Sequence, residues 1–145
     1  MGVLFDYFAA PDRAAAGAVI ESGPDGSFPA VSADGVDPVV LLGTLEELLG
    51  GRAYEEQLDD PSAGGLVDQR GEGQLLVLSV SEHTRDLLAG AKDDGFPGVS
   101  QAWAEAEEFG GYADPADLEQ LLRDLSVLAR DAKQEGHQLF CWVSV

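Results

Sequence analysis

The chain has one cysteine and two histidines, the residue types whose chemistry is easiest to recognise. Cys141 and His137 lie four residues apart, so a thiol and an imidazole could form a nucleophile and its base. The segment around them, GHQLFCWVSV, reads as a strand, however, and four residues of strand span about 13 Å at roughly 3.3 Å per residue. Because Cys141 stands between Phe140 and Trp142, we expect a buried thiol that packs as a small hydrophobic side chain.

His83 lies in the first turn of a helix that we expect to begin after Ser81. A histidine there could act as a base or as a ligand. Asp6 and Tyr7 lie in an N-terminal strand, and sites often form where strands end or enter turns. Asp6, Tyr7 and His83 therefore define a tentative ligand cleft. Ser79 and Ser81 stand at a strand–helix junction, where nucleophiles can occur, but helix capping accounts for Ser81.

Paired acids are the remaining candidates for chemistry, because neighbouring carboxylates could bind a hard cation. Four such pairs occur: Glu46-Glu47, Glu55-Glu56, Asp59-Asp60 and Asp93-Asp94. None follows the spacing of a calcium loop, and adjacent residues of a helix point in different directions. The histidines and the cysteine give no zinc spacing, and no phosphate-binding loop or nucleophile elbow is present. We therefore predict no catalytic residue, no cofactor and no metal ligand, and we interpret the acids as solvated charge.

The charge balance is the strongest compositional feature: eight Lys/Arg face 27 Asp/Glu, for a net charge of −19. Between Lys92 and Arg123 there are acids but no base. Such a surface should repel nucleic acid and anionic membranes, which attract Lys/Arg clusters. It either keeps the protein soluble or attracts a protein with a basic face, and both interpretations stay open. The candidate acidic surfaces are residues 93–119 and residues 46–60.

Apolar runs, caps and breakers place the elements along the chain. Strands are predicted at 3–8, 74–80 and 137–145, with a short extended piece near 28–31. Helices are predicted at 11–22, 37–50, 81–91, 100–108 and 114–136, with one further turn at 53–58. The helix at 114–136 has the clearest signals, since Asp114 can cap it, Pro115 follows, and Gly136 can end it. Residues 60–73 read as a flexible connector.

These elements predict one α+β domain over residues 1–145, with a small mixed sheet of three or four strands packed with about five helices. A chain of this length can bury roughly two thirds of its unfolded surface without a disulfide or a metal. The strand at 137–145 is apolar on both faces, so we expect it to be central in the sheet. Its odd-numbered residues should form one face, and Phe140 and Trp142 the other.

The sequence also predicts a cytoplasmic location. A single cysteine suits a reducing compartment, where disulfides are rare. The N-terminal segment MGVLFDYFAAPD has no basic leader and carries Asp6 within its apolar run, so it does not read as a signal peptide. No apolar run approaches the roughly 20 residues that a membrane helix needs. The oligomeric state stays open.

Three segments resemble the YfbM-like family, a group of small bacterial proteins of unknown function. They are DPVVLLGTLEELLGG, LSVSEHTRDLLAG and EQLLRDLSVLARDAKQEGHQLFCWVSV. In the first, the matching positions are Asp37, Leu45, Leu48, Leu49 and Gly51. The family's tryptophan and histidines are replaced there by Leu42, Gly43 and Glu46. The resemblance implies the same order of strands and helices and transfers no catalytic residue.

Taken together, these features predict a soluble cytoplasmic protein without catalytic activity that acts as a binding or protein-interaction domain through an acidic surface. Its partner would be a basic protein. The alternative is a small-ligand binder or an enzyme that uses the cleft near Asp6, Tyr7 and His83.

Overall fold

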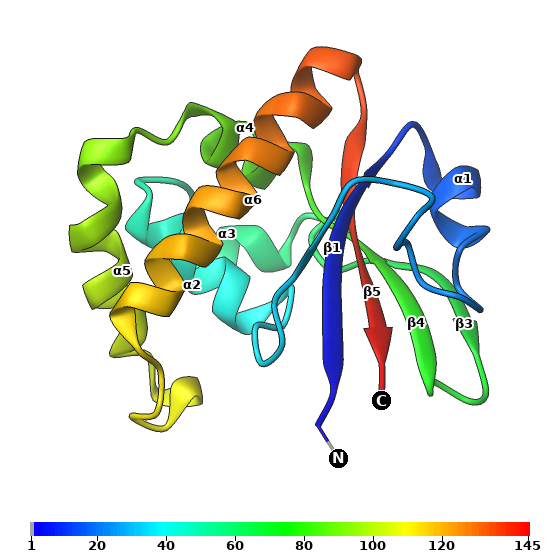
Figure 1. Ribbon diagram of the computed structural model, residues 1–145, viewed down its shortest axis with the longest axis horizontal. Coiled ribbons are helices and arrows are strands. Elements are labelled where there is room, and N and C mark those ends of the chain that lie inside the picture. The colour runs from blue at the N-terminus through cyan, green and yellow to red at the C-terminus, as the bar shows by residue number, and fades with distance from the viewer. Residues whose placement is uncertain (1) are drawn as a thin grey trace.

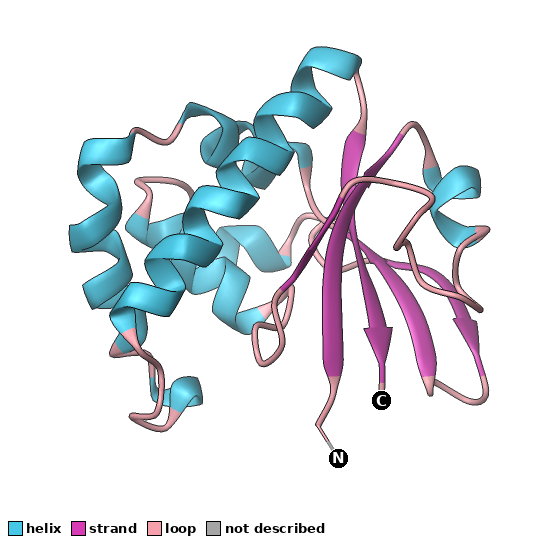
Figure 2. Ribbon diagram, in the orientation of Figure 1, coloured by secondary structure: helices cyan, strands magenta, loops and turns pink. Residues whose placement is uncertain are grey.

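The computed structural model describes residues 2–145 and shows an α+β fold, with one antiparallel sheet and a layer of helices against it (Figures 1 and 2). The strands are β1 (Leu4–Ala10), β2 (Ala30–Ser32), β3 (Leu66–Arg70), β4 (Leu75–Ser79) and β5 (Gln138–Ser144). The α-helices are α1 (Arg13–Gly17), α2 (Val40–Leu48), α3 (Tyr54–Leu58), α4 (Glu82–Gly90), α5 (Phe96–Ala104) and α6 (Pro115–Glu135). Two 3₁₀ turns, η1 (Asp93–Gly95) and η2 (Glu107–Phe109), flank α5.

The predicted class is confirmed, but the predicted sheet is wrong in detail. The sheet has five strands in the order β2-β1-β5-β4-β3, and every neighbouring pair is antiparallel, so it is neither mixed nor limited to three or four strands. Six α-helices within residues 2–145 replace the expected five, because the turn near residues 53–58 forms α3.

The strand that the sequence analysis missed is β3, which lies within the predicted connector at residues 60–73. Its side chains are mostly exposed and polar, so no hydrophobic pattern marks it. It forms because β4 pairs with it across a tight turn in which Gly71, Glu72 and Gly73 all have positive φ. Pairing with β4 in this hairpin therefore makes a strand of a sequence that is by itself typical of a loop.

Strand β5 is central, as its two apolar faces predict, since it pairs with β1 on one side and with β4 on the other. Leu139, Cys141 and Val143 join the larger core, which α2, α4, α5 and α6 cover. Phe140 lies in a smaller core on the opposite face, and the Trp142 indole there donates a hydrogen bond to a backbone carbonyl of the loop after α1.

Three of the predicted helix ends are confirmed, whereas α1 is shorter than the predicted helix at 11–22 and α2 begins at Val40 rather than at residue 37. Ser81 caps α4, Asp114 caps α6, and Gly136 ends α6 in the left-handed conformation. Ser100 does not cap α5, which begins four residues earlier at Phe96. The Ser100 side chain is buried inside α5, and among residues 2–145 its hydroxyl is the one buried side-chain polar atom without a hydrogen-bond partner.

Helix α6 organises the helix layer, running diagonally across it in Figure 1. Its apolar stripe packs inward, including Leu118, Leu122 and Leu125. The segment that contains β2 runs between β1 and α6, and it is the light-blue trace in Figure 1. No helix within residues 2–145 combines the length and the hydropathy needed to cross a membrane.

Candidate functional site

Glu46, in α2, is the one charged side chain that residues 2–145 bury completely, with 1% exposure. Its Oε2 accepts a hydrogen bond from Arg52 Nε at 3.1 Å, and its Oε1 accepts one from the Thr84 hydroxyl. Arg52 also donates to Asp60 Oδ2 at 3.0 Å and to Ser81 Oγ at 3.2 Å. We call these five residues the Arg52 cluster. The prediction that these acids are solvated charge is therefore wrong for Glu46 and Asp60. Their hydrogen bonds to Arg52 and Thr84 connect α2 to α4 and to the segment after α3.

Two glycines allow the chain to turn back so that Arg52 reaches Glu46. Gly50 adopts a φ of 84°, which a side chain would strain. A Cβ on Gly51 would collide with the Leu87 side chain and the backbone oxygen of Glu46. The hydrogen bond to Glu46 raises the pKa of Arg52 above its ordinary value. The guanidinium therefore stays charged and holds the cluster together.

The serines at the β4–α4 junction are fully engaged and offer no nucleophile. Ser81 Oγ accepts hydrogen bonds from the Thr84 N–H at 3.1 Å and from the guanidinium, and it lies 2.9 Å from Thr84 Oγ1. Because the Thr84 hydroxyl donates to Glu46, the Ser81 hydroxyl donates to Thr84. Ser79 donates to a backbone carbonyl 2.7 Å away. Helix capping of α4 by Ser81 is confirmed.

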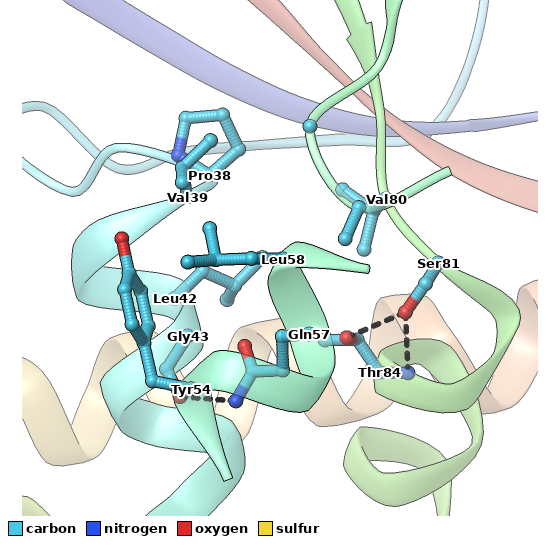
Figure 3. A pocket seen from close by; sticks show the side chains of 12 residues that line it. Pro38, Val39, Leu42, Gly43, Tyr54, Gln57, Leu58, Val80, Ser81 and Thr84 are labelled. Carbon is cyan, nitrogen blue, oxygen red and sulfur yellow. Dashed lines mark hydrogen bonds between the residues drawn. The ribbon is translucent and has the colours of Figure 1, made fainter. Parts of the chain in front are cut away.

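An interior pocket lies beside this cluster, between α2, α3 and the β4–α4 junction (Figure 3). Its walls are mainly apolar, and Gln57 contributes an amide that donates to two backbone carbonyls, of Gly43 and Arg52. The space open to the centre of a water molecule is about 20 Å³, which is enough for roughly one water. A small-molecule pocket needs hundreds of Å³. The pocket in Figure 3 is therefore a packing gap.

The structure does not bring Asp6, Tyr7 and His83 together. The Tyr7 side chain is 1% exposed in the larger core, and its hydroxyl donates to the Val36 carbonyl at 2.7 Å. Asp6 precedes Tyr7 in the same strand, so its side chain points to the other face, where its carboxylate accepts a hydrogen bond from Ser32. His83 lies on the exposed surface of α4. None of these three residues lines the interior pocket or the surface hollows described below.

Cys141 is buried at 0% exposure, as its neighbours in the sequence predict. Burial raises the pKa of its thiol well above the ordinary value of 9.0, and burial likewise raises the pKa of Tyr7, which lies opposite it on β1. His137 lies just before the same strand and lines a surface hollow. Within residues 2–145, no three side chains of His, Cys, Asp or Glu converge on a point where they could hold a metal ion.

Hollows larger than the interior pocket lie on the outside, between α6 and the β2 segment at residues 29–36. Three of them, of about 390, 370 and 550 Å³, follow one another along α6 and share lining residues, such as Ser32 between the first and third. We call this continuous channel the α6–β2 groove. On the helix side it is lined by Asp117, Leu121, Asp124, Val127, Leu128 and Asp131.

Apart from Glu119, which pairs with Arg123, the acids of α6 line the groove, whereas its bases lie on the other side. Asp117, Asp124 and Asp131 are seven residues apart, so they share one helix face, and all three are exposed. Within residues 2–145 none of them forms an ion pair. Arg123 instead stacks on Phe96 of α5, with 5.0 Å between guanidinium and ring. The seven-residue spacing of these acids can be read from the sequence, but the predicted acidic surface ended at residue 119 and so left out Asp124 and Asp131.

The other bases of α6 also lean away from the groove. Arg130 donates to the carbonyl of Ala89, and Lys133 lies 3.7 Å from the carboxylate of Asp86, both toward α4. The lining of the three hollows consequently contains no lysine and no arginine, although it contains six acids: Asp34, Asp114, Asp117, Asp124, Asp131 and Glu135. The groove is thus acidic along its whole length.

Comparison of the chain with protein-family models, curated proteins and solved structures found no match.

Proposed function

We propose that this protein is a non-catalytic binding protein that holds a lysine- or arginine-rich segment of a partner protein in the α6–β2 groove. The observation that supports it is the separation of charge on α6. Asp117, Asp124 and Asp131 face the groove without cationic partners, while the bases of the helix are drawn toward α4 and α5. Opposite fields steer two proteins together and fix their orientation.

The other acidic segment predicted from the sequence, residues 46–60, is a poorer candidate. Glu46 and Asp60 already bind Arg52, and the backbone N–H of Tyr54 donates to Glu47. Glu55, Glu56 and Asp59 remain exposed there, but none of the three lines any of the hollows described above. Two expectations from the sequence remain part of this proposal. The protein acts in the cytoplasm, where it would meet its partner, and it resembles the YfbM-like family.

A peptide titration tests the proposal. The probe is a fluorescein-labelled peptide of ten residues that alternates lysine and threonine, and the readout is fluorescence anisotropy at low salt. Replacing Asp117, Asp124 and Asp131 with asparagine removes three surface charge pairs, each worth up to about 1 kcal/mol. We expect the affinity to fall by about tenfold or more.

The matched control replaces three exposed acids outside the groove, in the variant Glu55→Gln, Glu56→Gln and Asp59→Asn. It changes the net charge by the same amount. The control should lose less affinity than the groove variant, because its three acids act on a peptide in the groove only through the long-range field, which weakens with distance. If both triple variants lose affinity equally, the groove is not the binding site, and the charge only serves solubility.

A further inference from the structure

The sheet edge that borders the groove has open backbone groups. In the β1–β2 pair, Ala33 N donates to Phe5 O at 2.8 Å and Ala9 N donates to Pro29 O at 3.2 Å. Hydrogen-bonded residues of an antiparallel pair alternate with residues whose N–H and C=O groups point to the other side. The register therefore directs the N–H and C=O groups of Ala30 and Ser32 away from β1, and no hydrogen bond from either N–H is present.

The opposite edge of the sheet, β3, is protected in a way that β2 is not. Its register shifts at a bulge between Leu66 and Asp68. The Arg13 side chain donates to the Leu66 carbonyl at 3.0 Å, and charged side chains stand along the strand. Bulges, charges and covering groups are the usual means of preventing an edge from pairing with another chain. On the β2 side, a hollow of about 550 Å³ lies between the strand and α6 instead.

The groove also offers side-chain contacts suited to an extended chain. Val31 and Leu128 line its floor, and Val127 is 53% exposed beside them. Asp124 and Asp131 flank these apolar side chains on α6. A strand laid along β2 would direct alternate side chains toward α6, so basic residues at every second position would meet the acids.

We infer that the partner segment binds as an added β-strand: an extended lysine- or arginine-rich stretch of another protein pairs with the outer edge of β2. This inference rests on the proposed function and adds the conformation of the ligand. Charge complementarity selects this occupant over a second copy of the chain, because two protomers of net charge −19 would repel each other across the same groove.

The test uses the full chain and two comparisons that leave the charge unchanged. The first compares the alternating lysine–threonine peptide with the same peptide N-methylated at its four central amides. Methylation keeps every positive charge but removes the N–H donors that an added strand needs. We expect the methylated peptide to bind at least about tenfold more weakly, since each net hydrogen bond is worth about 1 kcal/mol.

The second comparison is Ser32→Pro against Ser32→Ala. Both variants lose the hydrogen bond from Ser32 to Asp6, but only proline removes the outward N–H. Proline is tolerated on an edge strand where its N–H would face outward, and a matching unfolding midpoint of the two variants checks that the fold is kept. We expect Ser32→Pro to weaken peptide binding about fivefold or more relative to Ser32→Ala.

The outcomes separate the two proposals. If methylation and Ser32→Pro have no effect while the triple variant in the groove still weakens binding, the added strand is wrong and the acidic binding site stands. If the triple variant has no effect either, both are wrong. A dimer in sedimentation velocity that Ser32→Pro dissolves would identify a second copy as the occupant and would overturn the inference.

Discussion

Removing the guanidinium of Arg52 should destabilise the fold more than removing any exposed arginine. Glu46 is 1% exposed in the native fold, and in Arg52→Met its carboxylate would keep only the hydroxyl of Thr84 as a donor. Breaking a buried ion pair by deleting one partner costs about 3–5 kcal/mol. The Arg52 side chain is itself 21% exposed, so water can partly replace it, and we expect a loss near the lower end, about 3 kcal/mol.

Urea unfolding followed by tryptophan fluorescence measures this loss, because Trp103 is fully buried and Trp142 is partly buried. The matched control is Arg70→Met. Arg70 forms ion pairs with Asp68 at 2.7 Å and with Glu21 at 3.3 Å, but its side chain is 46% exposed. Exposed pairs contribute roughly 0–1 kcal/mol, so the control should change the free energy of unfolding by less than about 1 kcal/mol.

A second variant separates the buried charge from the loss of packing. Replacing both Arg52 and Glu46 with methionine removes the unpaired carboxylate as well, and apolar replacement of a buried pair is often neutral or stabilising. The double variant should therefore be more stable than Arg52→Met alone. Our reasoning is refuted if Arg52→Met and Arg70→Met cost the same, or if the double variant is the least stable of the three.

Three further outcomes follow from the geometry. Hydrogen bonds from Ser62, and then the guanidinium of Arg52, lower the pKa of Asp60 below its ordinary value of 3.8, so Asp60 stabilises the fold above that pH and the contribution is lost as the pH falls. The difference in unfolding free energy between the native chain and Asp60→Asn should accordingly shrink between pH 7 and pH 3. Burial raises the pKa of Cys141, so the folded state keeps the thiol proton while the unfolded thiol ionises near pH 9.0. The free energy of unfolding should therefore fall as the pH rises beyond that value, and it should fall less in Cys141→Ala. The native thiol should also react with a disulfide reagent only at the rate of unfolding. Gly51→Ala should cost about 1–3 kcal/mol through its collision with Leu87, whereas Gly98→Ala, with open space around its Cβ, should not destabilise the fold in thermal melts.

The parts of the fold that the sequence predicted are those with strong local signals. Asp114 and Gly136 fix the ends of α6, and Ser81 fixes the start of α4, because capping depends on neighbouring residues alone. The strand β5 was placed correctly because both its faces are apolar. By contrast, β3 and Ser100 were misassigned, since the first depends on pairing with β4 and the second on a helix that starts earlier than its best cap.

The charged residues show the same limit. Glu46 lies on the inward stripe of α2 with Leu42 and Leu45, but as one of two adjacent acids it reads as surface charge. Glu46 is buried only because the chain reverses at Gly50 and Gly51 and returns Arg52, six residues later, to its carboxylate. A pattern confined to one helix therefore predicts which residues can face inward, but not which charge a later turn will neutralise.

The acidic groove follows from how α6 divides its surface among three neighbours. One face packs Leu122 and Leu125 into the core, and the face toward α4 and α5 takes the bases, because backbone carbonyls, an aromatic ring and the carboxylate of Asp86 lie there. The third face, beside β2, then carries acids and apolar side chains but no base. Counted along the chain, acids and bases alternate through this helix and the net charge looks diffuse. Folding separates the acids of α6 from its bases, so that the helix presents only negative charge to the groove. This arrangement would select a basic strand over a neutral one.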